Sequence, residues 1–328
     1  MTRPALAALA LLLLFPSQAF CGATSFGEIF AAEPSVRANG MADAYAAAGA
    51  GDVWGSCYNP AHSASRNTAA FMYQRGYADD STGALAFSLP RLVGGFNLGL
   101  SLLYYNSGEM DLFTSAGSHR SVIGEKDYVA SAALSRSFGG YYSAGAALKL
   151  GHTALFEDAS ASATLLDLGI AADFPLLRIG AAVQNLGGNM KLGSEDEHIP
   201  SNWRIGASRS FGRGGLGAMS FTLASELYRR QYEPAYVRFG AEIGYSEMLA
   251  LRLGYELRNS VASANTLRFG AGFIFRSMTL DYAMVPYQDL GATHRVSVAW
   301  RFGRDASARL SEAAAAPALH PQERPPSP

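Results

Sequence analysis

The sequence predicts an all-β fold, a transmembrane antiparallel β-barrel of about 14 strands that follows a short N-terminal plug segment. Hydrophobic residues alternate with polar or small residues from residue 69 to residue 302, as in strands whose two faces meet different surroundings. Most alternating stretches have about ten residues, enough for a tilted strand to cross a bilayer, whereas strands of soluble proteins more often have about five or six. The connections alternate between short and long, as in outer-membrane barrels.

Composition excludes several other classes of protein. Of the 328 residues, 49% are hydrophobic and 16% are charged, and 26 Lys and Arg against 27 Asp and Glu give a formal net charge of −1. Such a chain lacks the basic surplus of a nucleic-acid binder, so no nucleic-acid partner is expected. Its hydrophobic fraction is too high for a mostly disordered chain. Its two cysteines, Cys21 and Cys57, are too few for a disulfide-dense scaffold or a four-cysteine zinc site.

Residues 1–23 have the features of a secretory signal peptide. Arg3 gives a positive start, residues 5–15 form an apolar run, and small residues at 17 and 19 offer a cleavage site. A second cleavage site lies at residues 21–23, and Phe20 before Cys21 disfavours a lipoprotein. No later stretch has about 18 consecutive apolar residues, so no second membrane-spanning helix is expected. We therefore expect an exported protein of the cell outer membrane.

The alternation predicts the strands in order. They lie at residues 69–79, 82–90, 94–106, 126–138, 141–152, 163–174, 177–186, 201–211, 217–227, 235–245, 248–258, 265–275, 278–287 and 293–302. Connections after even-numbered strands are short, such as 139–140, and most of those after odd-numbered strands are longer, such as 107–125 and 187–200. The short connection at 80–81 is an exception. We expect the short turns to face the periplasm and the long loops to face outward.

The charged residues determine which face of each strand meets lipid. In the strand at 248–258, alternate leucines share one face, while Arg252 and Glu256 share the other. An arginine on the lipid face at the bilayer midplane costs about 2–4 kcal/mol, so the leucine face is expected to meet the lipid bilayer. The same logic points these charges into the lumen: Arg238, Glu242, Arg252, Glu256, Arg268, Asp281, Arg295 and Arg301. The alternative is a soluble sandwich with the leucine face in its core.

The two ends of the chain lack the alternation. Residues 24–68 are rich in small side chains, and residues 34–48 could form a helix that begins near Pro34. We expect this segment to plug the lumen, with a periplasmic cap or a flexible lead as the alternatives. Residues 303–328 form an Ala- and Pro-rich tail with five prolines and no aromatic residue, which predicts disorder. A linker is expected there in preference to a tether.

No catalytic residue, metal site or cofactor is predicted, so the chain is not expected to be an enzyme. The six histidines show no paired metal-ligand spacing. Ser118 and His119 are adjacent in a long loop, which leaves an outer-membrane phospholipase as the enzyme alternative. The glycine-rich stretch at 212–217 matches a dinucleotide motif by its letters but lies in a turn with no helix after it. The acidic cluster at 195–197 is expected to be solvated.

Two groups of residues carry a resemblance to a known family. The N-terminal group resembles the signature of the PorV/PorQ family, within the wider FadL-type outer-membrane barrels: Pro34, Arg37, Gly40, Met41, Asp52, Asn59, Pro60 and Ala61. The second group resembles the family's C-terminal hairpin: Asp281, Pro286, Asp289, Gly291, Thr293, His294 and Arg295. Residues 166–169, 183–187 and 199–200 resemble the family's mid-barrel strand and the loop after it. Ala42 and His62 stand where the family usually has glycine.

The resemblance implies a 14-stranded barrel with a luminal plug, and it leaves two functions open. PorV-type members resemble cargo-binding components of type IX protein secretion, so the partners would be secreted proteins or other secretion-system subunits. FadL-type members pass hydrophobic small molecules through the barrel. We take the cargo-binding role as the first hypothesis and the hydrophobic channel as the alternative. Independently, we expect Asp289, Thr293 and His294 to hold the last hairpin closed.

Overall fold

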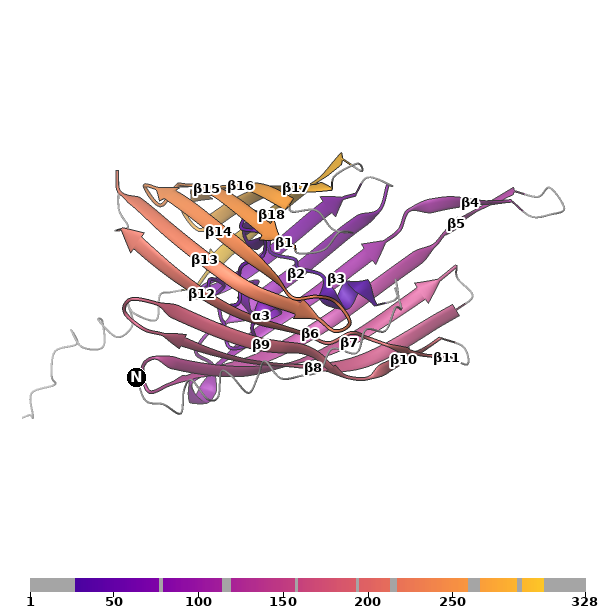
Figure 1. Ribbon diagram of the computed structural model, residues 1–328, viewed down its shortest axis with the longest axis horizontal. Helices are drawn as coiled ribbons and strands as arrows, with labels where there is room; N and C mark the ends of the chain where they lie inside the picture. Colours follow the sequence, from indigo (N-terminus) through magenta and orange to yellow (C-terminus); the bar gives the residue numbers. More distant parts are fainter. Residues whose placement is uncertain are drawn as a thin grey trace, which may run out of the picture.

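The barrel is closed and contains 14 antiparallel strands (Figure 1). The computed structural model describes residues 27–76, 79–113, 119–156, 159–192, 195–212, 217–258, 266–287 and 291–303. Around the barrel the strands follow the order β1-β18-β17-β16-β15-β14-β13-β12-β9-β8-β7-β6-β3-β2. The ring closes where β1 pairs with β18, from Asn67 opposite Phe302 to Arg75 opposite His294. The predicted fold class and strand number are therefore confirmed.

The strand bounds differ from the predicted ones by a few residues. The barrel strands are β1 (Asn67–Arg75), β2 (Ser81–Leu89), β3 (Phe96–Asn106), β6 (Glu125–Phe138), β7 (Tyr142–Leu155), β8 (Ala159–Asp173), β9 (Arg178–Gly187), β12 (Asn202–Gly212), β13 (Met219–Arg230), β14 (Tyr236–Tyr245), β15 (Leu249–Leu257), β16 (Thr266–Phe275), β17 (Met278–Tyr287) and β18 (Gly291–Phe302). The largest difference is at β7 and β8, whose pairing extends to Leu155 opposite Ala159. The predicted loop at 153–162 is thus mostly strand, because its small residues can continue the ladder.

Two of the predicted outer loops are hairpins. β4 (Glu109–Phe113) pairs with β5 (His119–Ile123), and β10 (Asn189–Leu192) pairs with β11 (Glu195–His198). The sequence predicted long connections at both places, and their pairing satisfies the backbone groups of a long connection outside the barrel. Figure 1 shows β4 and β5 projecting far beyond the rim. We call this end of the barrel, which carries both hairpins, the outer end.

The two faces of the wall divide as the alternation requires. Along β15 the leucines and Tyr255 are exposed, while Ala250, Arg252, Gly254 and Glu256 are buried. Large apolar side chains are exposed around the whole outer face of the barrel, for example Phe71, Leu134, Ile170 and Leu223. Such an apolar outer face suits acyl chains and would be costly in water.

The segment before β1 lies inside the barrel, and it contains short helical turns. They are η1 (Glu28–Ala31), α2 (Val36–Asn39) and α3 (Gly55–Tyr58). The helix expected over residues 34–48 is limited to α2, which the Ser35 side chain caps by accepting a bond from Ala38 N at 3.2 Å. It ends early because Ala42 and Asp43 have left-handed φ values of 52° and 59°. No helix among the described residues has the length and apolar content needed to span a membrane.

Glycines on the inward face let this segment approach the wall closely. A Cβ on Gly254 would lie 2.1 Å from Ala42 N, and one on Gly180 would lie 1.9 Å from Ala46 O. On the opposite side, a Cβ on Gly145 would lie 2.1 Å from Pro60 O. Backbone therefore packs directly on backbone at several points around the ring.

Replacement of Gly254 by alanine should destabilise the barrel by about 1–3 kcal/mol, because the added methyl group has no room beside the backbone of Ala42. Urea unfolding in phospholipid vesicles would measure this. Gly83→Ala is the control, since the nearest atom to its new Cβ is Met72 O at 3.9 Å. Equal unfolding free energies for Gly254→Ala and the wild type would contradict the close docking.

Candidate functional site

The lumen is divided into two chemically different halves, with the N-terminal segment between them. The wall from β12 to β18 carries buried or half-buried charges: Arg204, Glu226, Arg238, Glu242, Arg252, Glu256, Arg268, Asp281 and Arg295. The wall from β1 to β8 presents mainly apolar side chains to the interior, among them Met72, Leu103, Val129 and Leu165. We call these two regions the charged half and the apolar half.

Glu33 is the centre of the charged half. Its carboxylate accepts hydrogen bonds from Arg204 at 2.6 Å and from Arg238 at 2.7 and 3.1 Å. Burial alone would raise the pKa of Glu33, but the two guanidiniums outweigh burial and hold the pKa well below its usual range. Glu226 completes the cluster, since it accepts from Arg238 at 3.3 Å and from the backbone N–H groups of Tyr45 and Ala46 at 2.9 and 2.6 Å. One carboxylate from the segment and one from the wall thus share the same arginine.

Two further chains of ion pairs tie the segment to the same wall. Arg37 binds Glu242 through two bonds of 2.8 and 2.7 Å, and Arg252 joins Glu242 to Asp281 with two bonds of 2.6 Å. Asp43 accepts from Arg268, whose other nitrogen binds Glu256 at 2.9 Å. Paired carboxylates and guanidiniums of this kind hold position and orientation strongly in a site shielded from water.

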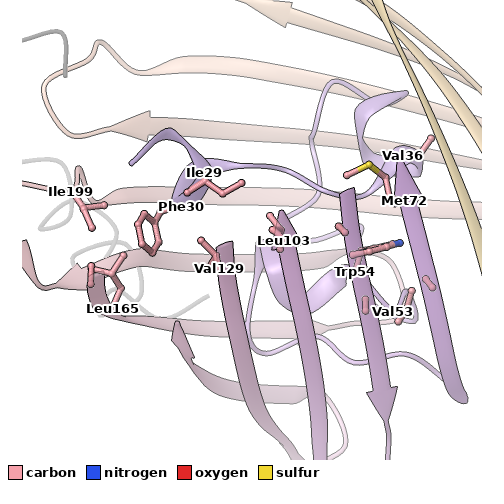
Figure 2. Packing of buried hydrophobic residues seen from close by; sticks show 14 of the residues in the cluster. Ile29, Phe30, Val36, Val53, Trp54, Met72, Leu103, Val129, Leu165 and Ile199 are labelled. Carbon is pink, nitrogen blue, oxygen red and sulfur yellow. The ribbon is translucent and has the colours of Figure 1, made fainter. Parts of the chain in front are cut away.

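The apolar half is closed by side chains of the segment and of the outer connections. Ile29, Phe30, Val36, Val53 and Trp54 point from the segment into this cluster. Met190 of β10 and Ile199, both from the connection between β9 and β12, also belong to this cluster. Figure 2 shows Phe30, Leu165 and Ile199 gathered at one end of the cluster, and Val36, Met72 and Trp54 at the other. A continuous apolar band therefore runs from the outer end into the middle of the barrel.

Buried polar side chains interrupt the apolar half at several positions, among them Asp127, Lys149 and Asp167. Lys149 Nζ lies 2.7 Å from Asp167 Oδ2 and donates to Asn185 Oδ1 at 2.9 Å. Asn185 has a left-handed φ of 59° and lies where the β8–β9 register shifts, between Leu166 and Leu168. Such a bulge re-aims the side chain of the extra residue. Here it turns Asn185 into the lumen.

A cavity of about 20 Å³ lies beside Lys149, between the segment and the wall. It is lined by Phe30, Cys57, Ser101, Leu103, Val129, Lys149 and neighbouring residues. Burial raises the pKa of the Cys57 thiol to about 11, so the thiol is neutral at physiological pH. The volume is about that of one water molecule, so no larger compound fits without movement of the segment.

The N-terminal signature residues all lie inside the barrel. Arg37 is in the ion-pair chain, Gly40 packs against the backbone of Gly270, and Met41 packs against Gly240. Asp52 accepts a bond from the Tyr45 hydroxyl and another from Trp54 N at 3.0 Å.

The Asn59-Pro60-Ala61 turn docks on the apolar half. Asn59 Nδ2 donates to Ala46 O and Ile170 O, both at 3.0 Å, and Asn59 Oδ1 accepts from Ala61 N at 3.0 Å. Pro60 lies against Gly145 and Gly169. One asparagine thus joins the segment, its own turn and the wall.

The C-terminal hairpin residues do not form one surface. Thr293 is buried in the lumen, and Arg295 donates to Asn39 Oδ1 at 2.7 Å. His294 is on the outer face, where its Nδ1 lies 2.7 Å from the Tyr282 hydroxyl. Thr293 and His294 point to opposite faces because side chains alternate along a strand, and their role in closing the hairpin stays a prediction.

The remaining predicted residues of this region lie in several places. Asp289 lies outside the described residues, Gly291 has a φ of 89°, and Pro286 pairs with Ala292. Arg301 is on the inward side but at the rim opposite the outer end, where it donates to Arg276 O at 3.3 Å. It therefore takes no part in the ion-pair chains of the charged half.

Comparison with known proteins supports the fold. No protein-family profile matches the chain, and no curated protein matches it in sequence. A solved toluene transporter of Pseudomonas putida, TodX, is similar with a TM-score of 0.55 and 11% identity, over 81% of this chain and 97% of that one. A FadL homologue of Pseudomonas aeruginosa has a TM-score of 0.50 and 12% identity, over 82% and 98%. The toluene transporter TbuX of Ralstonia pickettii has a TM-score of 0.50 and 13% identity, over 76% and 94%.

The chain has the fold of FadL-type outer-membrane barrels. The identities are too low to carry more than the fold, and the PorV/PorQ resemblance gains no support from these matches. The two transporters among the similar structures are described as carriers of toluene and not as enzymes.

The sequence reasoning missed part of the site. Arg204 and Glu226 were not singled out, although both occupy inward positions of the predicted strands at 201–211 and 217–227. Glu33 and Asp43 had no such signal, because the segment has no regular period. Lys149 and Asp167 could have been found by the same alternation that identified the other inward charges.

Replacement of Glu33 by glutamine should destabilise the protein by about 3–5 kcal/mol, because it leaves two buried arginines without a full counter-charge. Urea unfolding in vesicles would measure the loss. Glu28→Gln is the matched control, since Glu28 is 56% exposed and pairs with Arg230 near the rim. Its effect should stay within about 1 kcal/mol. Similar losses for both variants would show that the Glu33 cluster is not the anchor.

His62 should make the barrel sensitive to acid. Its ring nitrogen lies 2.7 Å from Ala46 O, and burial lowers the pKa of His62 to about 4. The unfolded chain takes up the proton near pH 6.5 and the folded chain only near pH 4, so stability falls as the pH drops between these values. The contribution of His62 to the loss between pH 7.5 and pH 5 should be about 2 kcal/mol, from about 1.4 kcal/mol per pKa unit.

The variant His62→Gln isolates this effect, because a glutamine amide can still donate to Ala46 O but does not titrate. The difference in unfolding free energy between pH 7.5 and pH 5 should shrink by about 2 kcal/mol relative to the wild type. An unchanged difference would mean that His62 does not hold its neutral form in the fold.

Proposed function

We propose that this protein is an outer-membrane channel that carries hydrophobic small molecules through the apolar half of its lumen. The observation that carries the proposal is the division of the lumen. An apolar band runs inward from the outer end, while every ion pair between the N-terminal segment and the wall, within the described chain, lies on the opposite side. An apolar compound would pass mainly hydrocarbon side chains along this band, with Asp127 and the Lys149–Asp167 pair as buried charged groups beside it.

Two features support a location in the outer membrane. The wall exposes large apolar side chains around its circumference, which suits a lipid environment. The expected signal peptide at residues 1–23 would deliver the chain across the inner membrane. Similar barrels of known structure include two toluene transporters, which adds support for an apolar cargo.

Opening would require movement on one side of the segment only. The ion pairs of Glu33, Arg37 and Asp43 fix the charged side, where separation would expose buried charges at a cost of several kcal/mol. On the apolar side, Phe30 packs so close to β7 that a Cβ on Gly151 would lie 1.9 Å from its ring. Packing, together with a hydrogen bond from Asn185 Nδ2 to Phe30 O at 3.2 Å, holds Phe30 there, and we assign the gate to Phe30 and its neighbours. A compound entering beside Phe30 would reach the small cavity next to Lys149.

Removal of the gate should speed transport. Phe30→Ala should raise the uptake of a hydrophobic fluorescent probe into liposomes several-fold, because it enlarges the 20 Å³ cavity by most of a phenyl ring. Uptake no faster than into empty liposomes, for both wild type and variant, would overturn the channel proposal.

A matched pair of isosteric variants tests which half conducts. Val129→Thr adds a hydroxyl to the apolar half and should slow uptake several-fold, because the path gains a polar group that an apolar compound must pass. Thr293→Val makes the reverse change on the charged half, where Thr293 is buried, and should leave uptake unchanged. Equal effects of both variants would contradict a path restricted to the apolar half.

Capture of secreted cargo is the second candidate function. The feature that favours it is the pair of hairpins β4–β5 and β10–β11, which offer backbone and side chains beyond the rim. This role rests on the PorV/PorQ resemblance and has less support than transport. Deletion of both hairpins should abolish co-purification of an exported protein while leaving probe uptake intact. Cargo retained by the deletion variant would exclude this role for the hairpins.

A further inference from the structure

A groove lies on the outside of the barrel. It has a volume of about 450 Å³ and crosses the outer face of β12, β13, β14 and β15. Its lining is almost entirely apolar, with Leu223, Phe239, Leu253 and Tyr255 as its raised sides. It faces away from the lumen, so it has no part in the proposed transport path.

The register explains why the wall is hollow at this place. Ala207 of β12 pairs with Ser225 of β13, and Ser225 pairs with Phe239 of β14. Two residues after Phe239, on the same outer face of β14, is Ala241, which pairs with Leu223. These three small residues lie on a diagonal between large neighbours. The diagonal crosses three strands, about 10 Å in all at about 4.8 Å per strand. A straight apolar chain can lie in a groove of this shape and contact its floor and both sides.

Arg209 lies at one end of the groove on the same outer face. It is three residues before the end of β12, so its Cα is about 10 Å along the strand from the periplasmic rim. Its guanidinium lies 4.4 Å from the centre of the Phe211 ring. No carboxylate of the described chain lies within ion-pair distance of Arg209. An arginine here can extend toward the lipid headgroups, where a phosphate would supply the missing counter-charge.

We infer that the groove and Arg209 together bind one phospholipid of the inner leaflet of the outer membrane. One acyl chain lies along the diagonal of Ala207, Ser225 and Ala241, and the headgroup phosphate pairs with Arg209. The position of the arginine decides the leaflet, because phosphates of outer-leaflet lipids lie at the opposite end of the barrel. The combination of an apolar groove and one unpaired cation at its end fits a lipid anion better than a free anion or an apolar solute.

The chain offers a built-in comparison for this site. Arg136 is also on the outer face near the periplasmic end, and its guanidinium lies 5.3 Å from the Phe96 ring centre. It likewise has no carboxylate partner among the described residues, but it borders no part of the groove. If phospholipid binding depended on charge alone, both arginines would contribute equally to it. If it depends on the groove as well, only Arg209 should contribute.

Native mass spectrometry of the delipidated full-length protein in detergent would test the inference. The probes are palmitoyl-oleoyl phosphatidylglycerol, the matching phosphatidylethanolamine, and palmitoyl-oleoyl glycerol, which lacks the phosphate. Both phospholipids should give a population with one bound lipid at low micromolar concentration, and the diacylglycerol should bind at least fivefold more weakly. Arg209→Gln should lower phospholipid binding at least fivefold, and Ala241→Phe should do the same by filling the groove. Arg136→Gln should bind as the wild type does.

Several results would overturn the inference. Equal binding by the wild type and Arg209→Gln would show that Arg209 does not bind the phosphate. Equal binding by the wild type and Ala241→Phe would show that the lipid does not lie in the groove. An equal loss in Arg136→Gln and Arg209→Gln would reduce the effect to general surface charge. Binding of the diacylglycerol as tight as that of the phospholipids would also contradict it. All three variants lie on the lipid face, and heat-modifiable migration on gels would verify that each barrel is closed.

Discussion

The structure depends on the ion pairs that fix the N-terminal segment to one wall of the barrel. Glu33, Arg37 and Asp43 from the segment meet Arg204, Arg238, Glu242 and Arg268 from the wall. Burying charges is costly unless each finds a partner, so the segment has essentially one position in which these costs are met. A barrel of this width would otherwise hold a short, irregular chain loosely. The network therefore supplies specificity of position more than net stability.

The apolar half shows the complementary principle. There the segment is held mainly by packing of Phe30, Val53 and Trp54, and by the Asn59-Pro60-Ala61 turn on the glycines of the wall. A few neutral hydrogen bonds add to this, such as those from Asn59 to Ile170 O and from Asn185 to Phe30 O. Packing contacts are short-ranged and undirected, so they can be replaced by contacts with an apolar compound at little cost. The ion pairs on the other side cannot be replaced in this way. In the proposed channel, this asymmetry would let one segment serve as a fixed support on one side and as a gate on the other.

The outer surface also combines apolar side chains with a few charged ones. Large apolar side chains form most of the lipid face, and small ones create a local hollow where a lipid chain can lie. Arginines near the periplasmic end are stacked on aromatic rings, which lets a charge remain at the edge of the apolar zone. Both faces of the wall therefore combine apolar side chains with a few charged ones. Several of the lumen charges pair with the N-terminal segment, and the outer-face arginines lie near one end of the barrel.

The sequence by itself determined the barrel, its strand number and the direction of most wall side chains. A strand has a period of two, and the cost of a charge in lipid leaves one choice of face, so local pattern suffices. The tertiary structure decided what the pattern could not encode. The segment has no period, so the pairing of Glu33 with Arg204 and Arg238 across about 170–205 residues of sequence was invisible before folding. The hairpins β4–β5 and β10–β11, the bulge at Asn185 and the split lumen likewise arise from which strands become neighbours. These features depend on contacts distant in sequence, and closure of the ring is what brings them together.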